Sequence, residues 1–317
     1  MAKPEQIFPE SNSKRWLPEY AVLWRYVPLR TLFFYLNGLV FIPSVAKLRA
    51  EDPFEGEFYE AIAWFNAAFS DVYGSAAPVI DEWILEELCL NHERKLVEIN
   101  KNDPNGANAA PEIFRKHYFD FVRRTRFAWC WFLSNLESAA MWSIYGNQGV
   151  AIKSTVGKIS AIFEKTGRNF TYGRMTYVDY RSGVSTDFNP ERKSDYRLLL
   201  RPFFLKRKEY ESEHEVRFVT SGADRTERGG VLLKDMNPQD WISAIRLWPG
   251  LTADEESSLH EAVHQFIPEV DCRKSDLFSG PSGPSELTEM IIADLEQSAD
   301  SSWTEGTDKI PPPLKIV

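Results

Sequence analysis

The chain has 317 residues, of which 43% are hydrophobic and 26% are charged, so it can form one large packed domain or two small ones. Its net charge of −9 argues against a general nucleic-acid-binding role, because contacts with phosphates need a basic stripe. No apolar run approaches about 18 residues, and the cysteines (Cys89, Cys130 and Cys272) are widely spaced, so we expect a cytoplasmic protein without a membrane segment or a disulfide framework.

The first part of the chain predicts two short strands around one helix. Residues 1–20 are polar with scattered prolines, and we expect them to be loosely ordered. Residues 21–27 read as a strand that ends at Pro28, and residues 29–37 carry apolar side chains at helical spacing before Asn37-Gly38. Residues 39–42 form a second strand, which Pro43 stops. An acidic turn follows at residues 51–56.

The middle of the chain predicts a helical insertion followed by a buried strand. The apolar spacing is helical from about residue 58 to residue 126. The near-continuous apolar run at 127–133 is typical of a strand buried on both faces, and we interpret its Trp129-Cys130-Trp131-Phe132 segment as core. Three basic patches, Arg115-Lys116, Arg123-Arg124-Thr125-Arg126 and Lys206-Arg207-Lys208, are interpreted as solvated surfaces.

The remaining elements alternate between helices and strands. Helices are predicted at 137–145, 154–166, 196–204 and 253–267, and strands at 150–153, 175–180, 210–218, 231–233 and 242–247. The strand at 231–233 is expected to return antiparallel to the strand at 210–218. We therefore predict an α+β fold with a mixed, mostly antiparallel sheet, a large helical insertion at 58–126 and flanking helices. It forms a single domain over 21–279, followed by a linker and an acidic, weakly ordered tail at 280–317.

The predicted strand at 210–218 carries an unusual row of charge. Read at a period of two, Glu211, Glu213, Glu215 and Arg217 share one face, while Val216 and Phe218 lie on the other. A one-faced row of three carboxylates is unfavourable, because like charges at that spacing repel each other. The row therefore indicates a polar site.

Four stretches together resemble the bacterial domain-of-unknown-function family 2971, which is related to abortive-infection proteins. They are Leu23-Trp24-Arg25-Tyr26, Asp52-Pro53-Phe54-Glu55-Gly56, Met141-Trp142-Ser143-Ile144-Tyr145 after Ser134, and Glu213-His214-Glu215-Val216-Arg217-Phe218. Their order and spacing agree over roughly residues 22–275. The chain departs from the family pattern at Glu51, Ile144 and Tyr210. The resemblance implies a role in bacterial stress or phage defence.

The same stretches look like the arginine–serine–glutamate pattern of ADP-ribosyltransferases, which use NAD. In that pattern Arg25 holds a cofactor phosphate, and Ser134 ends a central strand. Glu215 holds the nicotinamide ribose and stabilises an oxocarbenium-like transition state, while Glu213 orients or deprotonates the acceptor. Further cofactor-binding candidates are Tyr26, Trp142, Tyr145 and Arg217. The acceptor, a small molecule or a protein, and the oligomeric state stay open.

A structural interpretation of these residues competes with the enzymatic one. Arg217 could pair with Glu213 or Glu215, or with Asp52 or Glu55 in the acidic turn. A buried network of that kind would fix the fold without catalysing a reaction. The protein would then be a non-enzymatic, antitoxin-like interaction scaffold.

A third hypothesis is a zinc-dependent hydrolase built on His260-Glu261-Ala262-Val263-His264. Two histidines one helical turn apart, with a glutamate between them, match the zinc-protease pattern. The following residues lack the glycine and third histidine of the extended motif, so Glu286 or Glu289 would have to supply the third ligand. We interpret the match as a coincidence on a scaffold helix and expect no metal.

Overall fold

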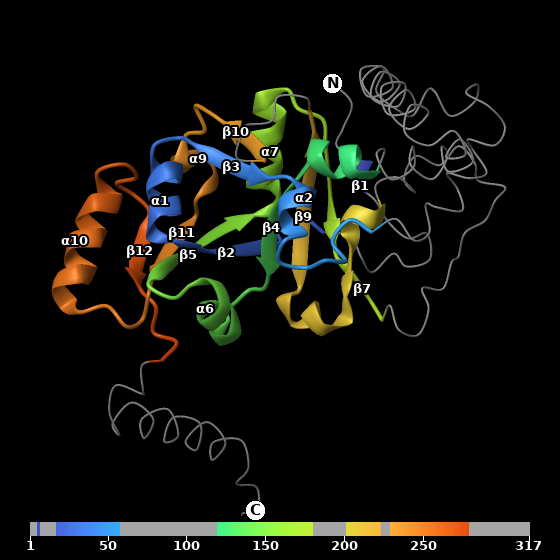
Figure 1. The fold of residues 1–317 in the computed structure, drawn as a ribbon. Coiled ribbons are helices and arrows are strands. Elements are labelled where there is room, and N and C mark those ends of the chain that lie inside the picture. The colour runs from blue at the N-terminus through green and yellow to red at the C-terminus, as the bar shows by residue number, and fades with distance from the viewer. Residues whose placement is uncertain (1–4, 7–16, 58–118, 180–200, 223–228, 279–317) are drawn as a thin grey trace, which may run out of the picture. The chain divides into compact units, whose positions relative to one another are not determined.

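The computed structural model describes residues 5–6, 17–57, 119–179, 201–222 and 229–278 (Figure 1). These residues form an eight-stranded sheet in the spatial order β1 (Glu5–Gln6), β6 (Phe170–Arg174), β9 (Glu215–Ser221), β4 (Arg126–Leu133), β2 (Val22–Pro28), β5 (Gly149–Thr155), β11 (Ala244–Leu247) and β12 (Asp271–Lys274). The pairs β1–β6 and β11–β12 are parallel, and the other neighbours are antiparallel. The predicted α+β fold with a mixed, mostly antiparallel sheet is confirmed.

Two smaller strand pairs accompany this sheet. The strand β3 (Val40–Pro43) pairs antiparallel with β10 (Gly230–Leu233), and β7 (Thr176–Val178) pairs parallel with β8 (Leu205–Arg207). The prediction that residues 231–233 return beside the glutamate strand is wrong, because Val231 lies opposite Ile42. Val231 and Ile42 are both buried in the main core. Gly230 permits this close pairing, since an added Cβ would lie 2.5 Å from the Ile42 carbonyl oxygen.

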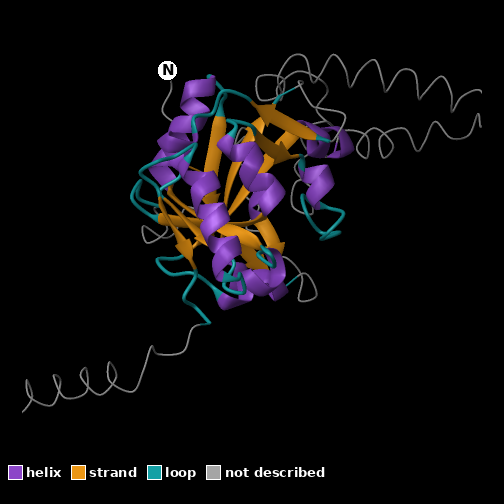
Figure 2. Ribbon diagram, turned by 90° about the vertical axis from the view of Figure 1, so that its left-hand side faces the viewer, coloured by secondary structure: helices purple, strands orange, loops and turns teal. Residues whose placement is uncertain are grey.

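Six α-helices whose bounds lie within the described residues surround the strands (Figure 2). They are α1 (Leu29–Leu36), α2 (Val45–Leu48), α6 (Ala139–Tyr145), α7 (Val156–Thr166), α9 (Pro238–Trp241) and α10 (Ala253–His264). α6 and α7 begin slightly later than predicted, because Ser138 and Thr155 are N-caps whose side chains accept N–H groups of the first turn. α10 begins with a capping box of Thr252 and Glu255.

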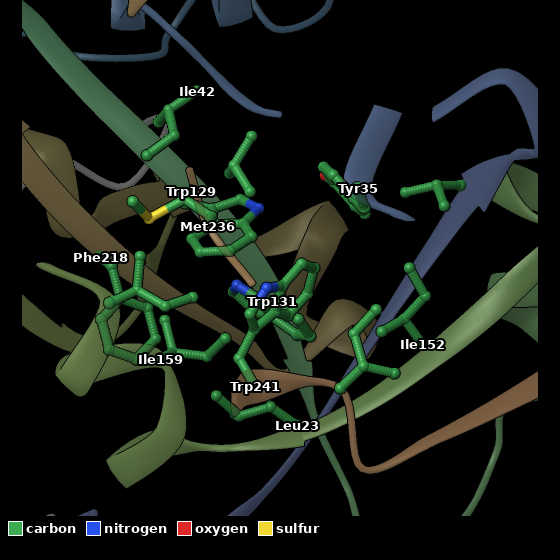
Figure 3. Close-up of a cluster of buried hydrophobic side chains, with 14 of the residues drawn as sticks. Leu23, Tyr35, Ile42, Trp129, Trp131, Ile152, Ile159, Phe218, Met236 and Trp241 are labelled. Carbon is green, nitrogen blue, oxygen red and sulfur yellow. The ribbon is translucent and has the colours of Figure 1, made fainter. Parts of the chain in front are cut away.

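The main core lies on one face of the sheet and is rich in tryptophan (Figure 3). Trp129 meets Trp131 and Trp241 edge to face, with ring centroids 5.2 and 5.5 Å apart. Phe163 of α7 stacks on Phe170 of β6 at 4.9 Å. The interpretation of the tryptophans of β4 as core is therefore confirmed. Cys130 lies on the other face, because side chains alternate along a strand.

The second face of the sheet carries a smaller cluster built around α6. Trp24 and Tyr26 of β2 pack there with Met141 and Trp142 of the helix. The hydroxyl of Tyr26 accepts the N–H of Ser138 at 2.7 Å, which fixes the start of α6 against β2. This arrangement places the end of α6 beside Lys208–Glu213, the 3₁₀ helix that precedes β9, as a hydrogen bond described below shows.

The ends of the predicted domain differ in detail from the expectation. Leu17 is 1% exposed and belongs to the core, so the chain is anchored before residue 20. The chain divides into two compact units, Met1–Ser275 and Asp276–Val317, whereas the sequence places the boundary after residue 279. Residues 58–118 of the predicted insertion lie outside the described residues, and residues 119–125 are helical up to the start of β4. None of the described helices has the length and hydrophobicity to cross a membrane.

The interpretation of the basic patches as solvated surfaces is wrong for two residues. Arg123 is 8% exposed and donates to the Gly56 carbonyl and to Asp120, both at 2.9 Å. Lys206 is also 8% exposed, and the carboxylates that pair with it are described with the polar site below. Both cations are buried because carboxylates or carbonyls of other segments meet them. Arg115 and Lys116 lie outside the described residues.

Candidate functional site

The glutamate strand begins five residues later than the sequence predicts. Lys208–Glu213 form a 3₁₀ helix, and His214, with a φ of 41°, leads from it into β9. The prediction of a strand over 210–218 is therefore wrong before Glu215. The segment 208–213 contains no β-branched residue that would favour a pleated strand. Within β9 the predicted alternation is correct, since Glu215 and Arg217 lie opposite the core residues Val216 and Phe218.

Arg217 is the centre of a buried charge network. Its two terminal nitrogens donate to the carboxylate of Glu55 at 2.7 and 2.5 Å, and its Nε donates to Glu215 Oε1 at 2.6 Å. It also donates to the carbonyl of Phe203 at 3.0 Å. Arg217 is 1% exposed, so nearly all of its charge is balanced by protein groups. The structural interpretation correctly named Glu215 and Glu55 as partners, whereas Asp52 forms an ion pair with Arg207.

Lys206 extends the network to the second carboxylate. Its ammonium group donates to Glu213 Oε2 and, at 3.0 Å, to Glu215 Oε2. The hydroxyl of Tyr145, at the end of α6, donates to the other oxygen of Glu213 at 2.8 Å. Glu213 is thus held between a helix on one side and β8 on the other. Glu211 is exposed and takes no part in this network.

The neighbouring cations fix the protonation state of Glu215. Burial by itself would raise the pKa of Glu215, but Arg217 and Lys206 outweigh it and lower that pKa to about 2. Burial would likewise lower the pKa of Lys206, yet Glu215 and Glu213 raise it. Burial raises the pKa of the nearby Cys130 thiol, which therefore keeps its proton at neutral pH. The backbone N–H of Glu215 donates to the Tyr177 hydroxyl at 2.8 Å.

Arg25 lies where two neighbouring strands of the sheet separate. The ladder between β2 and β4 contains two residue pairs, Leu23 with Leu133 and Trp24 with Phe132. At the next position the Arg25 side chain donates to the carbonyl of Cys130, and its Nε donates to the Tyr35 hydroxyl at 3.2 Å. Burial alone would lower the pKa of Arg25, but Tyr35, Cys130 and Glu215 raise it. Among the described residues, Arg25 forms no ion pair with a carboxylate.

A cleft of about 1160 Å³ opens at this separation. Arg25, Glu213, Glu215, Arg217 and Lys206 all line it. Its apolar walls come from α1, β3, β4 and α6, and include Phe34, Leu39, Phe41, Phe132 and Met141. Ligand sites combine apolar walls with a few convergent polar groups in this way. The cleft is therefore the candidate functional site.

The cleft gathers most of the predicted site residues and leaves two out. Tyr26 and Tyr145 line it together with the charged residues. Ser134 and Trp142 are not among its lining residues. The Ser134 hydroxyl accepts the N–H of Leu136 at 3.0 Å in the turn after β4, and the Trp142 indole donates to Glu137 at 3.0 Å. The expected convergence therefore holds for Arg25 and Glu215 but not for Ser134.

Sequence reasoning missed Lys206 and Tyr35 as members of this site. Lys206 follows the apolar run Phe203-Phe204-Leu205, and a lysine in such a run is a signal that could have indicated burial. Tyr35 occupies the buried face of α1, where its ring reads simply as core. Its hydroxyl accepts a hydrogen bond from Arg25 of β2, a contact between two elements that no local pattern predicts.

The histidine pair lies apart from the cleft. His260 and His264 stack on α10 with ring centroids 4.1 Å apart. Within the described ranges, no group of three or more His, Cys, Asp or Glu residues is arranged to hold a metal ion. The suggested third ligands Glu286 and Glu289 lie outside the described residues. The zinc hypothesis therefore gains no further ligand from this structure.

Comparison with known proteins finds no family model that matches the chain, and no similar curated protein or solved structure. The likeness to domain-of-unknown-function family 2971 therefore stays a proposal. The function has to be argued from the cleft itself.

Proposed function

We propose that the cleft binds an NAD-type dinucleotide and breaks the bond between its nicotinamide and ribose, in an ADP-ribosyltransferase-like reaction. One observation carries this proposal. Arg25 and the carboxylate of Glu213 line the same cleft, and Arg25 has no carboxylate partner among the described residues. NAD has the complementary polarity, since its pyrophosphate is anionic and its nicotinamide ring is cationic. Electrostatic complementarity of this kind sets ligand orientation as well as affinity.

Arg25 suits the phosphate end of such a ligand. A guanidinium group binds phosphate through paired, charge-assisted hydrogen bonds. Its Nε and one terminal nitrogen already donate to Tyr35 and Cys130, which fixes the orientation of the group before a ligand arrives. Arg30 also lines the cleft, and it lies 5.6 Å from the ring of Phe34. We assign the pyrophosphate to this side of the cleft.

Glu213 suits the reacting end better than Glu215. Both oxygens of Glu215 accept bonds from Arg217 or Lys206, so a ribose hydroxyl would have to compete with two cations for them. Glu213 accepts one bond from Lys206 and one from the uncharged hydroxyl of Tyr145, so only one cation competes with a ligand for its oxygens. We therefore assign Glu213 to the ribose and to the positive charge of the transition state, and Glu215 to holding Lys206 in place.

The size and walls of the cleft agree with this ligand. Its volume of about 1160 Å³ is slightly above the range of about 300–1,000 Å³ that is usual for small-molecule sites. Tyr145 is 41% exposed and presents its ring at the cleft, whereas Tyr26 is buried and meets Trp142 edge to face. Tyr145 is thus the better candidate to stack on the nicotinamide ring.

The second candidate, a non-enzymatic scaffold, is favoured by the closed pairing of Arg217 with Glu55 and Glu215. Such a network stabilises a fold whether or not a ligand binds. A scaffold has no need for a large cleft lined by an arginine that has no carboxylate partner in the described part of the chain, so the cleft supports the enzyme. Following the family resemblance, we place the activity in bacterial stress or phage defence.

Nicotinamide release from NAD tests the proposal. The matched variants are Glu213→Gln and Glu211→Gln, because the two glutamates lie on the same 3₁₀ helix but only Glu213 lines the cleft. We expect release by the wild type and by Glu211→Gln, and a loss of about a hundredfold or more in Glu213→Gln. Equal release by both variants, or none by the wild type, would contradict the proposal.

A further inference from the structure

We infer that the acceptor in this reaction is water rather than a protein side chain, so that the protein is an NAD hydrolase. The inference rests on the proposed function. The reacting carboxylate, Glu213, is deeply buried, and this burial limits which acceptor can reach the ribose.

The charged side chains at the reacting end of the cleft are almost completely buried. Glu213 is 8% exposed, Glu215 is 5% exposed and Lys206 is 8% exposed. Tyr145 closes over Glu213 from α6, and Lys206 closes over it from β8. An enzyme that modifies a protein must bring a side chain of that protein to the anomeric carbon of the ribose. A dinucleotide bound as proposed would fill the path to that carbon, so only a small nucleophile would fit beside it.

The geometry around Glu213 also suits activation of water. Burial raises the pKa of Tyr145, and the charge of Glu213 raises it further, so the phenol keeps its proton and donates to Glu213. Lys206 fixes the other oxygen of the same carboxylate. When the ribose arrives, one Glu213 oxygen stays bound to Lys206, and the oxygen that accepts from Tyr145 has a second lone pair for a water molecule. Tyr145 is therefore a positioning residue for that water.

The chemical step balances without any further reagent. The bond between the anomeric carbon and the nicotinamide nitrogen breaks, and its electron pair leaves with nicotinamide, which becomes neutral. A water oxygen forms the new bond to the anomeric carbon, and the proton that it loses passes to the Glu213 carboxylate and then to solvent. NAD and water thus give ADP-ribose, nicotinamide and one proton.

The distribution of labelled products tests this inference. NAD labelled in its adenine is incubated with the full-length protein, alone and with added proteins that expose Arg, Ser, Cys, Asp and Glu side chains. We expect free ADP-ribose in a one-to-one ratio with released nicotinamide, and no label on protein. Label bound to protein in amounts comparable to the nicotinamide would overturn the inference but leave the proposed function intact. No nicotinamide release would overturn both.

Tyr145→Phe provides the second measurement, with its fold checked by thermal unfolding. We expect kcat to fall about tenfold with KM nearly unchanged, because the ring remains for stacking while the hydroxyl that orients Glu213 is lost. Ser143→Ala is the control, since Ser143 lies on the same helix and its hydroxyl donates only to the Ala139 carbonyl in the described structure. An unchanged kcat in Tyr145→Phe would overturn the positioning role.

Discussion

Arg217 and Glu55 form a two-fold hydrogen-bonded ion pair across 162 residues of sequence, and neither side chain is more than 3% exposed. The pair joins the acidic turn after α2 to the strand that carries Glu215. Because the low dielectric of the interior makes an unpaired charge costly, this contact sets the position of Glu215 and, through Lys206, of Glu213.

Glu55→Gln is expected to lower the free energy of unfolding by about 3–5 kcal/mol, since it leaves much of the buried charge of Arg217 without a partner. Chemical denaturation measures the change. Glu51→Gln is the control, because Glu51 lies in the same turn but is exposed, and its cost should stay within about 0.5 kcal/mol. A similar cost for both variants would show that the pair is not a main support of the fold.

The lowered pKa of Glu215 makes the free energy of unfolding depend on pH in the acid range. Its pKa falls from 4.5 to about 2 on folding, so its contribution is present above pH 4.5 and is lost as the pH falls toward 2. Denaturation at several pH values should therefore show a steeper loss of stability in the wild type than in Glu215→Gln over this range. Asp271 and Glu255 also have lowered pKa values, but both remain in the variant. Parallel curves for the two proteins would contradict this prediction.

Substitutions at His214 test the position at which β9 begins. Its φ of 41° lies in the left-handed region, where a β-branched side chain is strained. His214→Val should therefore lower the free energy of unfolding by about 1–2 kcal/mol, while His214→Gly should be close to neutral. Ser212→Val, two residues earlier on the exposed 3₁₀ turn, is the control. A regular strand over 210–218 would instead tolerate valine at both positions.

Arg25 is expected to determine the affinity for the anionic end of the ligand. Arg25→Lys keeps the charge but loses the planar fork, which should weaken NAD binding about ten- to a hundredfold in calorimetry. Arg273→Lys is the control, because Arg273 is exposed on β12 and is not among the residues lining the cleft. Thermal unfolding checks that Arg25→Lys still folds. Equal affinity of the two variants for NAD would show that Arg25 does not contribute to binding.

Much of the fold follows from local pattern in the sequence. The strand at 127–133 and the helices near 29–37 and 154–166 were predictable, because burial on a fixed period leaves a clear signal in their apolar residues. The partner of residues 231–233 was not predictable, since strand pairing depends on contacts that are distant in sequence. The start of β9 was missed because alternating charge is compatible with a 3₁₀ turn as well as with a strand.

The residues of the site were easier to predict from the sequence than the contacts between them. Arg25, Glu213 and Glu215 line one cleft, as expected from their order in the chain. The burial of Lys206 depends on carboxylates supplied by two other elements, and the turn after β4 directs Ser134 into a local hydrogen bond. The burial of Lys206 arises from tertiary geometry, which the sequence pattern does not encode directly, whereas the Ser134 bond is a turn contact with a residue two positions along the chain.

The most direct test is a crystal structure with an unreactive NAD analogue, in which a carbon atom replaces the ribose ring oxygen. We predict the analogue in the cleft, with its pyrophosphate within hydrogen-bond distance of Arg25, about 2.7–3.2 Å, and its ribose on Glu213. Its nicotinamide ring should lie against Tyr145. An empty cleft at saturating analogue, or the pyrophosphate bound at Glu213 instead of Arg25, would contradict the central claim.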